Sequence, residues 1–131
     1  MRVEKILTKN DTGETGSHQS GIAIPKKEEF LNFFPKLPLH IKNPRAAINF
    51  FDEFDYAWQF DFVYYNNINW SGSRNEFRLV KIRPYIKRFE LRYLDKIILE
   101  KYQEKYYISH IKNNEKADVI RIEIPWTYFS D

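Results

Sequence analysis

The sequence predicts a mainly β protein, a closed or nearly closed barrel of seven short strands with two short helices. Three observations lead to this prediction. The chain has 131 residues, which is enough for one hydrophobic core but too few for two independent ones. Alternation of side chains with a period of two recurs along most of its length, as half-buried strands require. All four glycines fall in two breaks between the alternating segments, at residues 13–21 and at Gly72.

The alternating segments are short, and turn-forming residues separate them at a spacing that favours a barrel over a parallel α/β sheet. The clearest alternation puts Trp58, Phe60 and Phe62 on one face, where we expect them to form part of the core. In chain order, the predicted strands are residues 2–8, 21–24, 48–51, 58–65, 77–82, 106–111 and 118–124.

Two segments have helical spacing instead. Residues 27–34 form the first predicted helix, which Pro35 ends because proline disfavours helical dihedrals in the residue before it. The second covers about residues 90–102, where leucine and isoleucine recur every three to four positions. We therefore expect a single domain over residues 1–131.

Composition limits the class of protein. Hydrophobic residues make up 43% and aromatic residues 18% of the chain, which argues against disorder. The 21 Lys and Arg against 18 Asp and Glu give a net charge of +3, which permits a polyanionic partner without requiring one. With no cysteine, disulfides and thiol catalysis are excluded, and no apolar run is long enough for a membrane span. We expect a soluble, cytoplasmic domain that makes no membrane contact.

Catalytic motifs are incomplete. A metal-dependent nuclease needs an acidic residue on one strand and an Asp/Glu-x-Lys pair on the next. Asp52 and Glu53 supply the first half, but the candidate second half, Glu76-Phe77-Arg78, has arginine where lysine is needed. We therefore expect that the chain has no catalytic centre of its own and binds no cofactor.

The spacing of residues argues against two other kinds of site, a histidine metal site and a phosphate-binding loop. His18, His40 and His110 share no metal-ligand spacing, so no metal site is expected, and we assign the last two to structure. The glycine-rich segment after Gly13 resembles a phosphate-binding loop superficially, but Ser17 and His18 stand where such a loop has Lys and Ser or Thr.

The two glycine-containing breaks have the composition of loops that read base edges. Residues 9–21 carry almost every kind of hydrogen-bonding side chain, with little net charge. A single loop of this kind is more often a solvated connection, so that alternative stays open. The second break, about residues 67–78, adds arginines that can fork onto guanine and a glutamate that can accept from cytosine. Its alternatives are a Glu76–Arg78 pair on the strand surface and a simple turn at Asn75, while Trp70 suits either the core edge or DNA.

The sequences of both breaks resemble signatures of a known family. The segment Asn10-Asp-Thr-Gly-Glu-Thr-Gly-Ser-His-Gln-Ser-Gly-Ile-Ala-Ile-Pro25 is similar to the first signature of the N-terminal domain of EcoRII-type restriction endonucleases. Tyr64-Tyr65-Asn66-Asn67 and Ser73-Arg74-Asn75-Glu76-Phe77-Arg78-Leu79 resemble its second signature. The resemblance covers residues 1 to about 83, and Ala23 and Gly72 depart from it in ways that affect the target sequence.

The resemblance implies a DNA-binding pseudobarrel of the B3-like type, in which the loops after the first and fourth strands enter the major groove of double-stranded DNA. By this resemblance, the residues expected to read bases are Asp11, Thr15, Ser17, His18, Gln19, Arg74, Asn75, Glu76 and Arg78. The residues expected to contact the DNA backbone are Lys9, Lys81, Arg83, Lys87 and Arg88.

The family also implies a prokaryotic host and a role as the specificity or effector-binding domain of a restriction endonuclease. This chain lacks the separate catalytic region of such enzymes, so we expect a monomer as an isolated domain, or a domain tethered to a nuclease. Two rival interpretations remain: a compact metal-dependent nuclease, and a barrel that binds protein or RNA.

Overall fold

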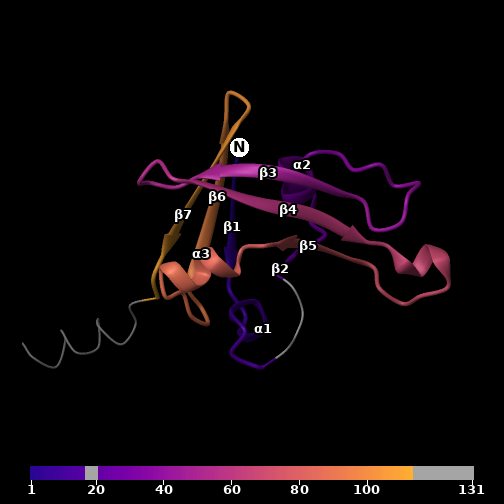
Figure 1. Cartoon of the computed structure of the whole chain (residues 1–131), viewed down its shortest axis with the longest axis horizontal. Coiled ribbons are helices and arrows are strands. Elements are labelled where there is room, and N and C mark those ends of the chain that lie inside the picture. Colours follow the sequence, from indigo (N-terminus) through magenta and orange to yellow (C-terminus); the bar gives the residue numbers. More distant parts are fainter. Residues whose placement is uncertain (17–20, 114–131) are drawn as a thin grey trace, which may run out of the picture.

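The computed structural model describes residues 1–16 and 21–113, and these form a mainly β structure with short helices (Figure 1). The elements in chain order are β1 (Arg2–Ile6), α1 (Lys9–Thr12), β2 (Ile22–Ile24), α2 (Glu28–Phe33), β3 (Arg45–Phe51), β4 (Ala57–Tyr65), the 3-10 helix η1 (Asn67–Trp70), β5 (Glu76–Val80), α3 (Arg83–Arg88), β6 (Lys96–Tyr102) and β7 (Lys105–Ile111). Within these two ranges, no helix combines the length and apolar character needed to cross a lipid bilayer.

The seven strands form one sheet in the order β1-β6-β7-β3-β4-β5-β2. All neighbouring strands are antiparallel except β3 and β7, which pair in parallel. The sheet curves into a nearly closed barrel with β1 and β2 at its edges (Figure 1). The predicted mainly β pseudobarrel is confirmed.

Aromatic rings fill the interior of the barrel. Phe60 and Phe62 on β4 are 0% and 2% exposed, and Trp58 packs against the same cluster, as the alternation predicted. Helix α2 lies inside the curve of the sheet and contributes Phe33, which is fully buried. Phe34, directly after α2, stacks on Phe62 with ring centroids 4.2 Å apart. Burial of several rings of this size is the main source of stability in a domain of this length.

The second predicted helix, about residues 90–102, is wrong. Its second half is strand β6, and Glu90 and Leu94 in the first half adopt left-handed dihedrals, with φ of 51° and 76°, which end any helix. Ile97, Ile98 and Leu99 are all buried, although successive side chains of a strand point to opposite faces of the sheet. A continuous apolar run of this kind suits a buried strand and a buried helix equally well, so periodicity alone could not separate them.

The turn between β6 and β7 explains why the strand was missed. Gln103 and Glu104 both have positive φ, 51° and 67°, as a two-residue type I′ hairpin turn requires. Neither residue is the Asn, Asp or Gly that usually marks such a turn. The predicted strand at 106–111 is confirmed as β7, and the one at 118–124 lies outside the described residues.

Gly21 lets the edge strand β2 approach β5 closely. Its φ is +66°, and a Cβ atom at this position would lie 2.0 Å from the carbonyl oxygen of Leu79 and 2.6 Å from Cα of Val80. Both contacts are with backbone, which cannot move aside as a flexible side chain can. Glycine is therefore required where the chain enters β2.

We predict that Gly21→Ala lowers the free energy of unfolding by about 2–4 kcal/mol, because strain in φ adds to the backbone clash. The matched control is Gly16→Ala, where φ is also positive, at +77°, but no atom of the described residues lies within 4 Å of the added Cβ. This control should lose only about 1 kcal/mol. Urea unfolding curves measure both, and equal losses would contradict the requirement for close approach.

Candidate nucleic-acid interface

Two long connections project from one part of the sheet, as the sequence predicted. The first arm, residues 7–21, joins β1 to β2 and contains α1, and the second arm, residues 66–75, joins β4 to β5 and contains η1. Because β2 and β5 are antiparallel neighbours, the first arm meets this strand pair at Ile22, opposite Leu79, and the second arm meets it at the other end, at Glu76 (Figure 1).

The root of the first arm is held by Asp11. Thr8 and Asp11 form a capping box at the start of α1, in which each side chain accepts from the other residue's backbone N–H. The second carboxylate oxygen of Asp11 accepts from the backbone N–H of Ala23 in β2 at 3.0 Å, and Lys5 Nζ lies 3.4 Å from Asp11. Asp11 is 1% exposed. The expectation that Asp11 reads a base is therefore corrected: its oxygens are occupied within the fold.

Residues 14–16 of the first arm are exposed. Thr15 is exposed and its hydroxyl donates to Asn10 Oδ1 at 2.6 Å, while Asn10 in turn accepts at its backbone oxygen from Arg83 Nη2 at 3.2 Å. Three further residues expected to read bases from this arm lie outside the described residues, namely Ser17, His18 and Gln19.

The second arm is anchored by a residue that sequence reasoning did not single out. Asn66 is fully buried, its amide oxygen accepts from the backbone N–H of Asn43 at 2.7 Å, and its amide nitrogen donates to the carbonyl of Ile41 at 2.9 Å. Beyond this anchor, η1 presents Ile68 and Trp70, which are 50% and 42% exposed. The tip of the arm thus exposes two apolar side chains among polar ones, and Trp70 lies outside the core.

The return of the second arm carries a row of paired charges. Arg74 Nε lies 3.3 Å from one oxygen of Glu76, and Arg78 Nη1 lies 3.0 Å from the other. The Arg74 guanidinium also stacks over the ring of Tyr65 at 3.8 Å, and the Tyr64 hydroxyl donates to Asn75 Oδ1 at 2.7 Å. These tyrosines, which belong to the second signature but had no expected role, hold two candidate reading residues in place.

Arg78 differs from its neighbours in burial. It is 3% exposed, and its Nη2 donates to the backbone oxygen of Gly21 at 2.9 Å, at the root of the first arm. The expectation that Arg78 reads a base is corrected in the same way as for Asp11. The alternative of a Glu76–Arg78 pair is confirmed, and this pair links the two arms through β2.

Glu76 keeps its charge in this setting. Partial burial acts to raise the pKa of Glu76, but hydrogen bonds from Arg74 and Arg78 and their positive charges outweigh it, so the pKa lies below its ordinary value. Glu76 is thus an ionised acceptor held between two arginines.

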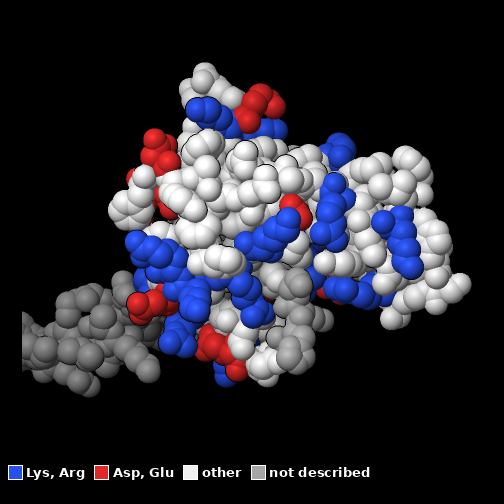
Figure 2. Space-filling model, in the orientation of Figure 1, with Lys and Arg blue, Asp and Glu red and all other residues white. Residues whose placement is uncertain are grey.

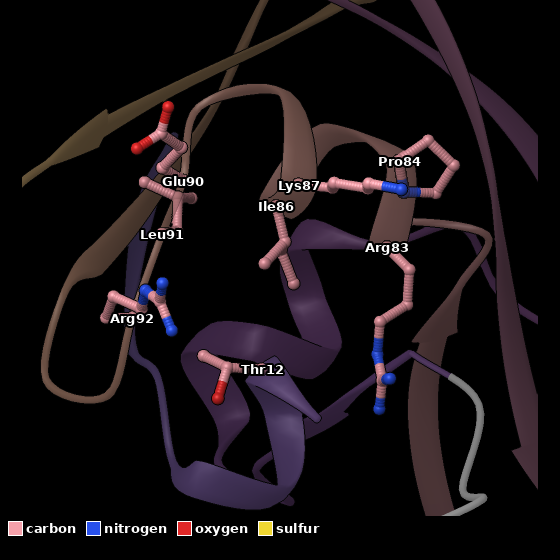
Figure 3. A pocket seen from close by; sticks show the side chains of 8 residues that line it. All are labelled: Thr12, Arg83, Pro84, Ile86, Lys87, Glu90, Leu91 and Arg92. Carbon is pink, nitrogen blue, oxygen red and sulfur yellow. The ribbon is translucent and has the colours of Figure 1, made fainter. Parts of the chain in front are cut away.

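Basic side chains surround the arms. Figure 2 shows Lys and Arg gathered in a band that runs from α3 across the face toward η1. Lys81 is exposed and pairs with the buried Asp61 at 3.0 Å. Lys87 lines a groove of about 720 Å³ between α3 and α1, together with Arg83, Arg92 and Thr12 (Figure 3). We call this the basic groove; because Thr12 belongs to the first arm, the groove adjoins that arm.

Not every expected backbone-contacting residue lies beside the arms. Lys9 is exposed on α1, with its Nζ 5.2 Å from the ring centroid of Tyr93. Arg88, in contrast, lies over the ring of Phe89 at 5.1 Å and lines a different pocket beside the β3–β4 turn. No group of three or more His, Asp or Glu side chains in residues 1–16 and 21–113 could hold a metal ion.

Comparisons with known proteins agree with this geometry. The family model described as restriction endonuclease EcoRII, N-terminal, matches residues 2–88. No curated protein matches the chain in a sequence comparison. Among solved structures, the Arabidopsis FUS3-DNA complex is similar with a TM-score of 0.66 and 20% sequence identity, over 84% of this chain and 95% of that one. The resemblance and the B3-like fold predicted from the sequence are confirmed.

We predict that the contribution of Glu76 to stability depends on pH. Since the pKa of Glu76 is lower in the folded chain than its ordinary 4.5, its stabilising effect is complete above pH 4.5 and disappears as the pH falls through the folded value. Glu76→Gln should therefore cost about 1 kcal/mol at pH 7 and much less in acid, measured by thermal unfolding across pH. Glu104→Gln, at the exposed β6–β7 turn, is the control. A Glu76→Gln loss that stays constant down to pH 2.5 would contradict the ion-pair assignment.

Proposed function

This chain belongs to the family described as restriction endonuclease EcoRII, N-terminal, and from that premise we propose that it binds double-stranded DNA sequence-specifically. The two arms enter the major groove, whose base edges carry a distinct pattern of donors and acceptors for each base pair. The observation that carries this proposal is the pairing of β2 with β5, which attaches the two polar loops to opposite ends of one strand pair and so sets them at a fixed spacing. The similar fold of the Arabidopsis FUS3-DNA complex supports it.

The exposed polar side chains of the arms contact the base edges. In the second arm, Arg74 and Asn75 are positioned by tyrosines before any ligand arrives, which reduces the entropy lost on binding. Arginine forks onto guanine, asparagine onto adenine, and the ionised Glu76 accepts from the amino group of cytosine. In the first arm, Thr15 contacts a base. The exposed Trp70 at the tip of η1 gives an apolar surface for a thymine methyl group.

The basic residues around the arms contact the phosphates and so position the protein on the duplex. Lys9, Lys81 and the basic groove with Arg83, Lys87 and Arg92 follow the path of a DNA strand beside the first arm. Contacts of this kind fix the register of a protein on the duplex but carry no sequence information. Arg88 is left out of this set because it lies in the pocket beside the β3–β4 turn.

Within a restriction system, the domain serves as the specificity or effector-binding part of an endonuclease, and a separate nuclease domain supplies cleavage. The isolated chain binds one site as a monomer. Selection from a random pool of duplexes tests the proposal directly, because it reports binding, target sequence and symmetry together. Absence of any enriched sequence would sink it, as would clean cleavage of plasmid by the purified chain with magnesium.

We predict that reading and positioning residues give different mutational signatures. Arg74→Ala should weaken binding to the selected duplex by about 1–3 kcal/mol and leave binding to unrelated duplexes almost unchanged. Lys87→Ala should weaken both alike, because a phosphate contact is independent of sequence. Lys105→Ala, at the exposed β6–β7 turn far from both arms, is the control and should change neither. Fluorescence anisotropy with both duplexes measures all three, and a uniform loss for Arg74→Ala would remove it from the reading set.

Salt dependence provides a separate prediction. Each phosphate contact contributes about −0.9 to the slope of log affinity against log salt concentration, because binding releases condensed counterions. Lys87→Ala and Arg92→Ala should each make the slope shallower by about one, whereas Arg74→Ala should leave it unchanged. A wild-type slope near zero between 50 and 200 mM salt would rule out DNA as the partner.

A further inference from the structure

A second cavity lies at the far end of the barrel from the arms. It has a volume of about 320 Å³ and is lined by Asp52, Phe54, Tyr56, Trp58, Arg88 and Phe89. We call it the turn pocket, since the turn between β3 and β4 forms one side of it and the end of α3 forms the other.

The walls of the turn pocket are aromatic and open to solvent. Phe54 is 69% exposed and Tyr56 is 59% exposed, although each belongs to a ring cluster. Phe54 stacks on Phe89 with centroids 6.2 Å apart, and Tyr56 meets Trp58 edge-on at 4.9 Å. Adjacent exposed rings of this kind are uncommon on a monomer surface and mark interaction sites, where Trp, Tyr and Arg carry most of the binding energy.

The turn that carries these rings is rigid. One carboxylate oxygen of Asp52 accepts from the backbone N–H of Phe54 at 2.9 Å and of Tyr56 at 3.0 Å. The other accepts from the indole N–H of Trp58 at 2.9 Å. Burial acts to raise the pKa of Asp52, but these three bonds and the charge of Arg88 lower it overall, so the carboxylate is ionised at neutral pH. The exposed rings are therefore preorganised around a negative charge.

The β3–β4 turn beside the pocket is negative in net charge, whereas the pocket lining itself holds one carboxylate, Asp52, and one guanidinium, Arg88. Glu53 and Asp55 are exposed on the same turn, and neither forms an ion pair with any of the described residues. With Asp52 they make three carboxylates, against the single guanidinium of Arg88. Acidic side chains gather over this turn in Figure 2, opposite the end that carries η1. Charge of this sign excludes a nucleic acid as the occupant.

The position of the turn pocket leaves the arms free. Strand β4 has nine residues and runs from the β3–β4 turn to the start of the second arm (Figure 1). At about 3.3 Å per residue, the pocket lies roughly 30 Å from η1. An occupant of the pocket therefore leaves the second arm free, and no residue that lines the pocket also lines the basic groove.

We propose that the turn pocket is a docking site for a basic segment of a protein partner, and that an arginine side chain of this partner enters it. A planar guanidinium stacks on aromatic faces and gains cation–π attraction there, and the carboxylates of the turn complement its charge. Arg88 already shows this mode of contact within the chain, over the ring of Phe89. The inference is independent of DNA binding, because no residue of the arms takes part in it.

A matched pair of peptides tests the proposal on the full chain. The probes are acetyl-Leu-Arg-Leu-amide and the same peptide with citrulline, which has nearly the shape of arginine but no charge. The arginine peptide should bind about tenfold more tightly, from the cation–π and charge terms together. The readout is a nuclear magnetic resonance titration, in which the indole N–H of Trp58 reports on the pocket because it is bonded to Asp52. Equal affinity for both peptides, or shifts that spare the turn and α3, would overturn the proposal.

Variants at exposed positions separate the charge effect from folding. Asp55→Asn with Glu53→Gln should reduce the preference for arginine over citrulline about threefold, and asparagine suits the left-handed φ of 65° at position 55. Arg88→Ala should strengthen binding of the arginine peptide about threefold, since it removes a like charge. Glu104→Gln, at the distant β6–β7 turn, should change nothing. Weaker binding of the arginine peptide by Arg88→Ala would overturn the proposal and point to an anionic occupant. None of these variants should alter DNA affinity, so failure here leaves the proposed DNA binding intact.

Discussion

The geometry of both arms depends on how the three-residue edge strand β2 is held against β5. A strand this short makes few ladder bonds, and two buried charged side chains supplement them. Asp11 accepts from the N–H of Ala23, and Arg78 donates to the carbonyl of Gly21. Gly21 permits the approach, since any Cβ there would meet the backbone of β5. Residues 21–23 are thus held by two charged side chains, a carboxylate from the first arm and a guanidinium from β5.

This arrangement divides the charged residues of the two signatures into two roles. Moving a buried, fully bonded charged side chain to the surface costs free energy, because the groups that bonded to it are left buried without a partner. Asp11 and Arg78 therefore stabilise the fold, and the proposed reading of bases rests on neighbours that keep exposed atoms, such as Arg74 and Asn75. Glu76 stands between the two groups, since one of its oxygens meets the buried Arg78 and the other the more exposed Arg74. This glutamate thereby connects Arg74 to Arg78, which bonds to Gly21 at the root of the first arm.

The sequence predicted the parts of the molecule in which local chemistry decides the outcome. Glycine placement located both arms, and the aromatic alternation of β4 located the core. Strand β6 was missed because its apolar run carries no period and its turn, Gln103-Glu104, lacks the usual turn residues. The sequence also could not show that Asp11 is buried whereas Thr15 is exposed, since both are polar residues of one loop. The Thr8-x-x-Asp11 spacing was a usable signal, because it is that of a helix cap, and a capping side chain has little freedom to reach a ligand.

Net charge alone gives little guidance to the partners of this protein, because a value of +3 on 131 residues is small. The distribution of charge is more informative. The band of basic side chains reaches η1 at one end of the β3–β4 hairpin, and the carboxylates of Glu53 and Asp55 lie on the turn at the other end. Charges separated by more than about 10 Å are largely screened at physiological salt, so each end acts on its own ligand. A small, stiff hairpin can therefore present a surface for a polyanion and a surface for a cation without either cancelling the other.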